Sequence, residues 1–300
     1  MSSDFVIPRD VITVDVEEWF HGHNYLDHMP PEVWGDQELR VEKGMALCLD
    51  LLDKYQVKGT FFVLGWTAER HPDVVREIVR RGHEVGCHSY SHPEVFKLTR
   101  DQFRADCDHA LEALSAAGVS TPAGYRAPSF SITPSVHDYL DVLRDCGFRY
   151  DCSIFPVHHP RYGQPDSPRR PFTLAGAGPR FTVVPMPTWR ILGLNVPFSG
   201  GGYLRLLPWR AFTYLRKRAR RQGVPCLVYM HPWEMDDFKP RVGQSTATSL
   251  RSQGGQATMP AKISKILEMG DFETLGEYVD RLEKAGNLPA LDPRSRLTRI

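Results

Sequence analysis

Short apolar runs alternate with amphipathic helical patterns along most of the chain, and this alternation constrains the fold more than any other feature. Runs typical of buried strands occur at 11–16, 59–64, 84–87, 124–128, 148–151 and 225–230. Helical patterns occur at 39–55, 73–81, 99–117, 134–146, 209–221 and 272–285. Because strands that alternate with helices form parallel sheets, the sequence predicts an α/β fold.

Polar residues follow most of these runs at the point where the strand ends. Asp15 and Glu17 close the first run, His88 follows the third, Arg126 the fourth and His231 the last. The carboxyl ends of barrel strands meet on one face and build the active site there. This placement favours a (β/α) barrel over an open sheet.

Length and composition indicate one globular domain. Three hundred residues, of which 41% are apolar, can form a sizeable core, and we find no internal repeat and no second apolar unit. We expect a single catalytic domain at 1–290 and a tail at 291–300. Residues 156–205 are rich in Pro and Gly and interrupt the alternation, which predicts a long insertion that walls a cleft.

Charge and cysteine content exclude several classes of partner and compartment. The net charge of +1 provides no global field that would recruit nucleic acid or an anionic membrane. The basic segment 209–221 has two interpretations, a patch for an anionic ligand and a solvated helix face, of which we prefer the second. Six scattered cysteines without a C-x-x-C pair predict reduced thiols. The amino terminus lacks the pattern of a signal peptide, and no window approaches 18 uninterrupted apolar residues. We therefore expect a cytoplasmic protein without an integral membrane segment.

Two histidines near the third strand indicate a metal site. His88 and His92 are separated by Ser, Tyr and Ser and followed by a proline, so we expect them on a loop rather than a helix. Two imidazoles and one carboxylate, with room for water, are the general form of a hydrolytic metal site. Glu17 supplies the carboxylate. Asp15 lies two residues earlier on the same face of the strand and is placed to act as a base.

Three further strand ends complete the predicted site. Arg126 is expected to keep Asp15 ionised by charge pairing, and His231 to protonate a leaving amine. Asp151 has two interpretations, as a residue that orients His231 or as a structural bridge between strands. Four loop histidines are interpreted as surface residues rather than ligands: His21, His23, His158 and His159.

Five segments in fixed order resemble the motifs of the polysaccharide deacetylase superfamily (NodB-like, carbohydrate esterase family 4). They are TVDVE at 13–17, HSYSH at 88–92, RAPSF at 126–130, DCS at 151–153 and YMHPWE at 229–234. The resemblance spans residues 10–285 and is closest to the branch found in bacterial exopolysaccharide clusters. It implies a distorted (β/α) barrel, commonly with seven strands. It also implies metal-dependent removal of N-acetyl groups from amino sugars of a polysaccharide or glycoconjugate, with Zn²⁺ as the expected ion and Co²⁺, Ni²⁺, Mn²⁺ or Fe²⁺ as alternatives.

Two motifs depart from the commoner pattern of that family. The first usually has adjacent aspartates, whereas here Val16 intervenes and Glu17 takes the place of the ligand. On a regular strand Glu18 points away, and a bulge would exchange the two glutamates. The third motif reads Pro-Ser-Phe instead of ending in Pro-Tyr, so a backbone amide near Ser129 is the expected oxyanion donor. Trp233 is expected to form a wall of the cleft.

Three classes of function remain. The leading one is a carbohydrate N-deacetylase. The second is an amidohydrolase that acts on a small cyclic amide or ureide, since relatives with altered first motifs do that chemistry on this fold. The third is a non-catalytic carbohydrate-binding relative, against which the intact set of polar strand ends argues. A groove lined by aromatic side chains would favour a polymer, and a closed pocket would favour a small molecule.

Overall fold

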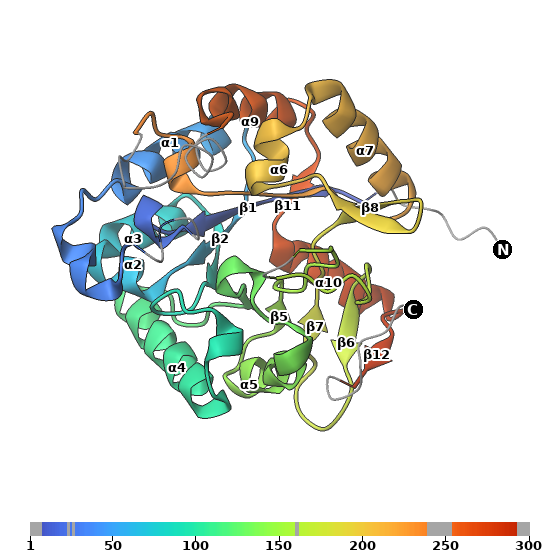
Figure 1. The fold of residues 1–300 in the computed structure, drawn as a ribbon, viewed down its shortest axis with the longest axis horizontal. Coiled ribbons are helices and arrows are strands. Elements are labelled where there is room, and N and C mark those ends of the chain that lie inside the picture. Colours follow the sequence, from blue (N-terminus) through green and yellow to red (C-terminus); the bar gives the residue numbers. More distant parts are fainter. Residues whose placement is uncertain (1–7, 23–24, 26–27, 160–161, 239–253, 293–300) are drawn as a thin grey trace.

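A curved, mostly parallel sheet with helices around its outside forms the body of the protein (Figure 1). The computed structural model describes residues 8–22, 25, 28–159, 162–238 and 254–292. The expected α/β domain with a distorted barrel is confirmed. In the described ranges no helix has both the length and the apolar character needed to cross a membrane.

The main sheet has ten strands, nine of them in the spatial order β10-β1-β2-β3-β4-β5-β7-β6-β12, with β11 paired to β1. The strands are β1 (Asp10–Val16), β2 (Thr60–Val63), β3 (Glu84–Cys87), β4 (Gly124–Tyr125), β5 (Tyr150–Asp151), β6 (Phe172–Leu174), β7 (Thr182–Val183), β10 (Leu227–Met230), β11 (Phe272–Glu273) and β12 (Ala290–Leu291). Every pairing from β10 to β7 is parallel, whereas β6 runs antiparallel to β7. The expected number of seven does not describe this sheet, because β6, β11 and β12 extend it.

Helices follow most strands, as the alternation predicts. They are α1 (Val41–Lys54), α2 (Gly65–Arg70), α3 (Pro72–Arg80), α4 (Arg100–Ala116), α5 (Leu140–Asp145), α6 (Gly201–Leu206), α7 (Trp209–Arg221), α9 (Met259–Leu267) and α10 (Leu275–Ala285). The prediction of one helix over 272–285 is wrong at its start, because β11 occupies the first two positions. Thr274 then accepts a hydrogen bond from the amide of Glu277 at 3.2 Å and begins α10. An apolar residue at the start of a helical pattern fits a strand equally well.

Strand β1 is buried on both faces. Ile12, Val14 and Val16 pack in the core between the sheet and the helices, whereas Val11 packs in a second cluster. Side chains alternate along a strand, so the face of Val11 continues through Thr13 to Asp15. The inner face of β1 therefore changes from apolar to polar towards its carboxyl end, where the site lies.

The segment expected to be an insertion, 156–205, contributes β6 and β7 to the sheet. It continues into a hairpin of β8 (Thr188–Ile191) and β9 (Leu194–Pro197) and then into α6. Between the hairpin and α6, the carbonyl of Ser199 accepts from the amide of Tyr229 at 3.2 Å, and Gly200 forms a parallel bridge with Tyr229. The part of the segment around Gly200 thus lies along β10, at the opposite end of the strand order from β6 and β7. The predicted tail begins within β12, and its residues 293–300 lie outside the described ranges.

Gly200 is expected to tolerate no side chain. A Cβ atom there would lie 1.9 Å from Cδ1 of Tyr229, whose side chain is almost fully buried. Gly200→Ala should therefore lower the free energy of unfolding by about 1–3 kcal/mol, as in other overpacked sites. Urea denaturation measures the change. Gly35→Ala is the control, because a Cβ there meets nothing within 4 Å; equal losses in the two variants would contradict this account.

Candidate active site

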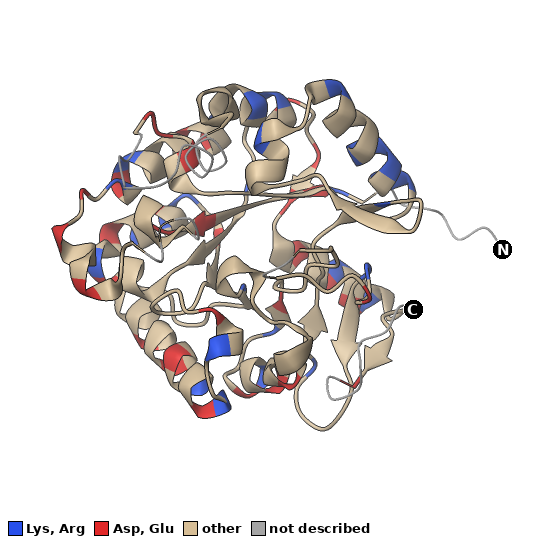
Figure 2. Cartoon of the chain, viewed as in Figure 1, with Lys and Arg blue, Asp and Glu red and all other residues tan. Residues whose placement is uncertain are grey.

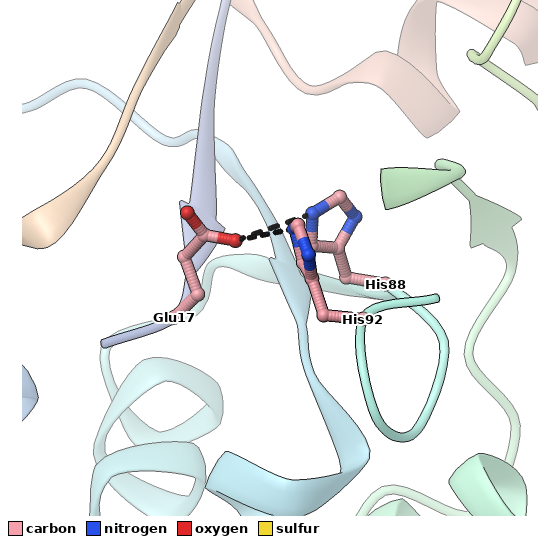
Figure 3. Close-up of side chains that lie close together, drawn as sticks. All are labelled: Glu17, His88 and His92. Carbon is pink, nitrogen blue, oxygen red and sulfur yellow. Dashed lines mark ion pairs between the residues drawn. The ribbon is translucent and has the colours of Figure 1, made fainter. Parts of the chain in front are cut away.

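Three side chains from two segments of the chain converge at the carboxyl ends of β1 and β3 (Figure 3). Glu17 Oε2 lies 2.9 Å from His92 Nε2 and 3.7 Å from His88 Nε2. All three residues are buried, and one potential ligand atom from each lies within 4.8 Å of the others. The structure therefore brings together the three residues that the sequence predicts as metal ligands.

The hydrogen bonding of this cluster fits a divalent metal ion. His88 Nδ1 lies 2.7 Å from the carbonyl oxygen of Arg126, which can only accept, so Nδ1 donates and the ring lone pair is on Nε2. Glu17 Oε2 is buried and has no hydrogen-bond partner among the described residues. A carboxylate and two imidazole nitrogens form a common donor set for Zn²⁺. The residues present thus fit the metal that the sequence predicts.

Electrostatics keep two of these ligands in the forms that bind metal. Burial alone would raise the pKa of Glu17, but the imidazoles of His92, His231 and His88 together hold it well below its usual range. Burial lowers the pKa of His88 to about 4. At neutral pH Glu17 is therefore a carboxylate and His88 is neutral.

The two histidines lie on a loop, as expected. Ser89 and His92 adopt positive φ angles of 68° and 58°, which no helix contains. The Ser89 hydroxyl accepts from the amide of His92 at 3.1 Å, and the carboxylate of Asp106 in α4 accepts from the amide of Tyr90 at 3.0 Å. The carbonyl of Ser89 accepts from the amide of Gly65 at 2.8 Å. Neighbouring helices therefore hold the loop that carries both imidazoles.

The adjacent glutamates occupy different environments. The carboxylate of Glu18 accepts hydrogen bonds from the backbone amides of Arg40 at 2.9 Å and Val41 at 3.0 Å. These amides lie at the beginning of α1, where a negative charge is favourable. Glu18 thus supports α1, and Glu17 is the glutamate that faces the histidines.

Asp15 is held by a buried arginine beside the cluster. Arg126 Nη1 donates to Asp15 Oδ1 at 2.6 Å and to Thr13 Oγ1 at 2.8 Å. The guanidinium lies over the ring of Phe62, 4.3 Å from its centroid, and Arg126 is fully buried. Only Oδ1 of the Asp15 carboxylate is engaged by described residues. The pairing of Asp15 with Arg126 corresponds to the charge pair that the sequence predicts.

His231 enters the site after β10 and is oriented by Glu234. Its Nε2 lies 3.8 Å from Glu17 Oε1, and its Nδ1 lies 3.0 Å from Glu234 Oε2. Glu234 is buried and also accepts from Arg205. Burial alone would lower the pKa of His231, but the hydrogen bond and charge of Glu234 raise it to about 9. Sequence reasoning missed Glu234, although it follows His231 by three residues within a quoted motif.

Asp151, which the sequence offered as a partner of His231, hydrogen-bonds to Ser153 instead. Its carboxylate accepts from the amide of Ser153 at 2.9 Å and from the hydroxyl of Ser153 at 2.5 Å. The Ser153 hydroxyl in turn accepts from the amide of Ala127 at 2.8 Å, so Asp151 supports the connection between β4 and β5. Of the two interpretations, this geometry favours the structural one.

A pocket of about 690 Å³ opens over the cluster, and residues of 156–205 form part of its wall. The ring of Trp233 stacks on His231 with centroids 4.8 Å apart and lines the pocket, where the sequence places it. Aromatic side chains form much of the remaining lining: Tyr25, Phe130, Tyr162, Tyr203 and Tyr229. Polar strand ends at the floor and aromatic rings at the walls suit a ligand with both polar groups and flat apolar faces.

The turn after β4 is strained at the pocket. Ser129 and Phe130 both have positive φ angles, 51° and 52°, and Ser129 lines the pocket. The amide of Phe130 donates to the carbonyl of Ala127 at 3.1 Å, whereas the amide of Ser129 donates to no described residue. The role of this amide as an oxyanion donor stays a prediction.

The interpretation of His21 as a surface histidine is wrong. His21 is fully buried, and its ring stacks on that of His92 with centroids 6.1 Å apart. Its Nδ1 accepts from the amide of Glu18 at 3.1 Å, and burial lowers the pKa of His21, so the ring is neutral. Its burial comes from packing against Trp34 and Trp66, which a sequence pattern around His21 does not show. Of the other three, His158 is exposed, His159 lines the pocket and His23 lies outside the described residues.

Two family profiles match adjacent parts of the chain. The one described as Polysaccharide deacetylase matches residues 36–150, and the one described as Domain of unknown function (DUF3473) matches residues 152–280. Among curated proteins, the peptidoglycan-N-acetylglucosamine deacetylase of Bacillus cereus is 39% identical over 80 residues, which cover 27% of this chain and 29% of that protein. The chain thus matches less than a third of the length of this relative.

Solved structures share the fold. A candidate polysaccharide deacetylase from Mycobacterium smegmatis aligns with a TM-score of 0.65 and 22% identity over 98% of this chain and 96% of that chain. An allantoinase aligns with a TM-score of 0.59 and 15% identity over 94% of this chain and 92% of that chain. At these identities the likeness establishes the barrel architecture and no activity.

The different roles of the two glutamates can be separated by metal content. Glu17→Gln should abolish tight binding of Zn²⁺, because it removes the anionic ligand. Glu18→Gln should keep one bound Zn²⁺ per chain but lower the melting temperature, because it weakens the beginning of α1. Elemental analysis after dialysis and thermal unfolding measure the two effects. Equal metal loss in both variants would contradict the assignment of Glu17.

Asp151 should make stability depend on pH. Burial raises its pKa from 3.8 to about 7, so the folded protein retains a proton that the unfolded chain releases. The stability of wild type relative to Asp151→Asn should therefore decrease as pH rises from about 4 to about 7, by at most about 1.4 kcal/mol per pH unit. Urea denaturation across this range measures the difference. Exposed Asp145→Asn is the control, and a difference that does not change with pH would disprove the buried titration.

Proposed function

The chain belongs to the polysaccharide deacetylase superfamily, and on this premise we propose that it is a metal-dependent hydrolase that removes N-acetyl groups from amino sugars of a glycan. The observation that carries the proposal is the buried group of Glu17, His88 and His92, within 4.8 Å of one another, at the floor of an aromatic pocket. The curated relative named above is a deacetylase of N-acetylglucosamine, which supports this class of substrate.

The acid and the base have separate positions around the cluster. A divalent ion, of which Zn²⁺ suits the donor set best, would polarise an amide carbonyl and lower the pKa of water when bound there. Asp15 accepts a proton from the attacking water, and Arg126 holds its carboxylate in place. The amide of Ser129 is available to donate to the oxyanion that forms on the acetyl carbonyl.

His231 completes the reaction from the other side. As a C–O bond forms between water and the acetyl carbon, the amide bond between the acetyl carbon and nitrogen breaks, and His231 donates a proton from Nε2 to the departing nitrogen, which stays on the sugar. The products are acetate and a free amine. Glu234 keeps Nδ1–H of His231 engaged at 3.0 Å, which favours the protonated ring needed for this step.

The test is acetate release from N-acetylated hexosamine oligomers and from peptidoglycan fragments. Protein stripped with a chelator should be inactive and should recover on addition of Zn²⁺ or Co²⁺. Asp15→Asn should lower kcat by about 10²–10⁴-fold, because general-base catalysis contributes about that much, while the bound metal is retained. His92→Gln should lower both turnover and metal content.

The control is Asp145→Asn, an exposed carboxylate outside the pocket, which should keep wild-type kcat. Near-normal turnover by Asp15→Asn would disprove its role as the base. Hydrolysis of a cyclic ureide by the metal-loaded protein, together with no acetate release from any glycan, would assign the site to the small-amide class instead.

A further inference from the structure

One long stretch of the chain carries positive charge without any acid. Between Asp166 and Glu234 there are eleven Lys and Arg residues and no Asp or Glu, although the whole chain has a net charge of only +1. This stretch contains the β8–β9 hairpin and α7, which pack together. Figure 2 shows α7 banded with basic residues and free of acidic ones. The near-neutral total thus conceals a local positive face.

The exposed side of α7 is basic along its length. Arg210, Tyr214, Lys217, Arg218 and Arg221 are all exposed. Their spacing of three or four residues places them on one face of the helix. Within the described ranges, none of these four cations lies within 4 Å of a carboxylate oxygen. The two remaining arginines of α7 differ, because Arg216 and Arg220 pair with buried Asp10.

The tip of the β8–β9 hairpin is apolar and exposed. Leu192 is 99% exposed, Leu194 is 62% exposed and Ile191 is 44% exposed. Leu192 also has a positive φ of 47°, followed by Gly193 at 84°, in a turn that normally selects Asn-Gly. Leucine at this position is unfavourable both for the backbone and for solvation. Leu192 thus departs both from the backbone preference of the turn and from the preference of leucine for burial. Such a departure indicates an interaction with a partner outside the chain.

The hairpin joins the basic face to the pocket. Arg218 lies over the ring of Trp189 in β8, 5.2 Å from its centroid. Val196 of β9 lines the active-site pocket and lies four positions after Leu192, a span of at most ~13 Å. A surface that binds the hairpin tip would therefore lie near the mouth of the pocket.

A second pocket, of about 640 Å³, is lined in part by β8 of the hairpin, and its charged lining residues are positive. Arg169, Arg170 and Arg190 line it, and no acidic residue does. Burial and then the charges of Arg190 and Arg170 lower the pKa of Arg169. An anionic group from outside the chain would relieve this repulsion.

We propose that the tip residues Ile191, Leu192 and Leu194, together with the basic face of α7, bind an anionic lipid bilayer. We call these residues the docking face. The apolar tip inserts among the acyl chains below the head groups, while the cations of α7 contact lipid phosphates. A nucleic acid would account for the cations but not for the exposed leucines, and a neutral apolar partner would account only for the tip.

Docking of this kind would hold the pocket at the membrane surface. The membrane binding does not depend on the proposed deacetylation, because it is measured without turnover. If acetate release failed while vesicle binding held, the proposed function would fall and the docking face would stand.

Flotation with vesicles tests the proposal. The full chain should bind vesicles of equimolar phosphatidylcholine and phosphatidylglycerol, bind phosphatidylcholine alone far more weakly, and dissociate as salt rises. Lys217→Gln with Arg218→Gln should weaken binding roughly 30-fold, from about 1 kcal/mol for each basic side chain near the surface. Leu192→Ser with Leu194→Ser should weaken it by about tenfold or more, because the inserted apolar area is lost.

The matched control is Leu39→Ser with Leu47→Ser, which removes two leucines that are 40% and 41% exposed but lie away from the hairpin. This control should bind vesicles as wild type does, and circular dichroism should show that all variants are folded. Equal binding of wild type to neutral and anionic vesicles, or equal losses in the tip and control variants, would overturn the proposal. Retention on heparin or DNA without any binding to vesicles would overturn it as well.

Discussion

The site depends on one buried cation, Arg126, which ties four neighbouring strands together. Its guanidinium binds Asp15 and Thr13 of β1 and covers Phe62 of β2, while its backbone amide donates to the carbonyl of Cys87 at 2.9 Å. Its own carbonyl accepts from His88 and so sets the ring tautomer. A buried charge is costly to desolvate, and it is retained only where its partners are well placed. The same residue therefore positions the base and prepares a metal ligand.

The parts of the site that obey simple periodicity could be predicted. Strand alternation places Asp15 and Glu17 on one face and turns Glu18 away. The structure agrees, because the carboxylate of Glu18 accepts hydrogen bonds from backbone amides at the start of α1. The Ser-Tyr-Ser spacer with its following proline predicts a loop for His88 and His92, and both residues lie on one. These inferences need only the period of a strand and the backbone limits of proline.

The parts of the site that depend on three-dimensional contacts could not be predicted from the sequence. Nothing in a linear motif shows that Glu234, rather than Asp151, reaches Nδ1 of His231, because the choice depends on the turn that follows β10. The burial of His21 depends on the packing of Trp34 and Trp66 around it, and these residues are far from it in sequence. The basic stretch between Asp166 and Glu234 is visible in the sequence, but only the fold shows that cations of α7 share one exposed face and that the helix packs on β8.

The two halves of the chain contribute different parts of the chemistry. The segment that matches the deacetylase profile, 36–150, supplies His88, His92 and Arg126, and hence two metal ligands and the support for the base.

The segment that matches the second profile, 152–280, supplies His231 with its partner Glu234. It also supplies Arg205 of α6, which binds Glu234 and lines the pocket, and the hairpin strand that forms another part of the pocket wall. Only residues 198–200 separate the hairpin from α6, so the hairpin and the arginine that binds Glu234 are close neighbours in the chain. The acid and its supporting residues thus come from the segment that contains the hairpin, whereas the metal ligands lie just after the carboxyl ends of β1 and β3.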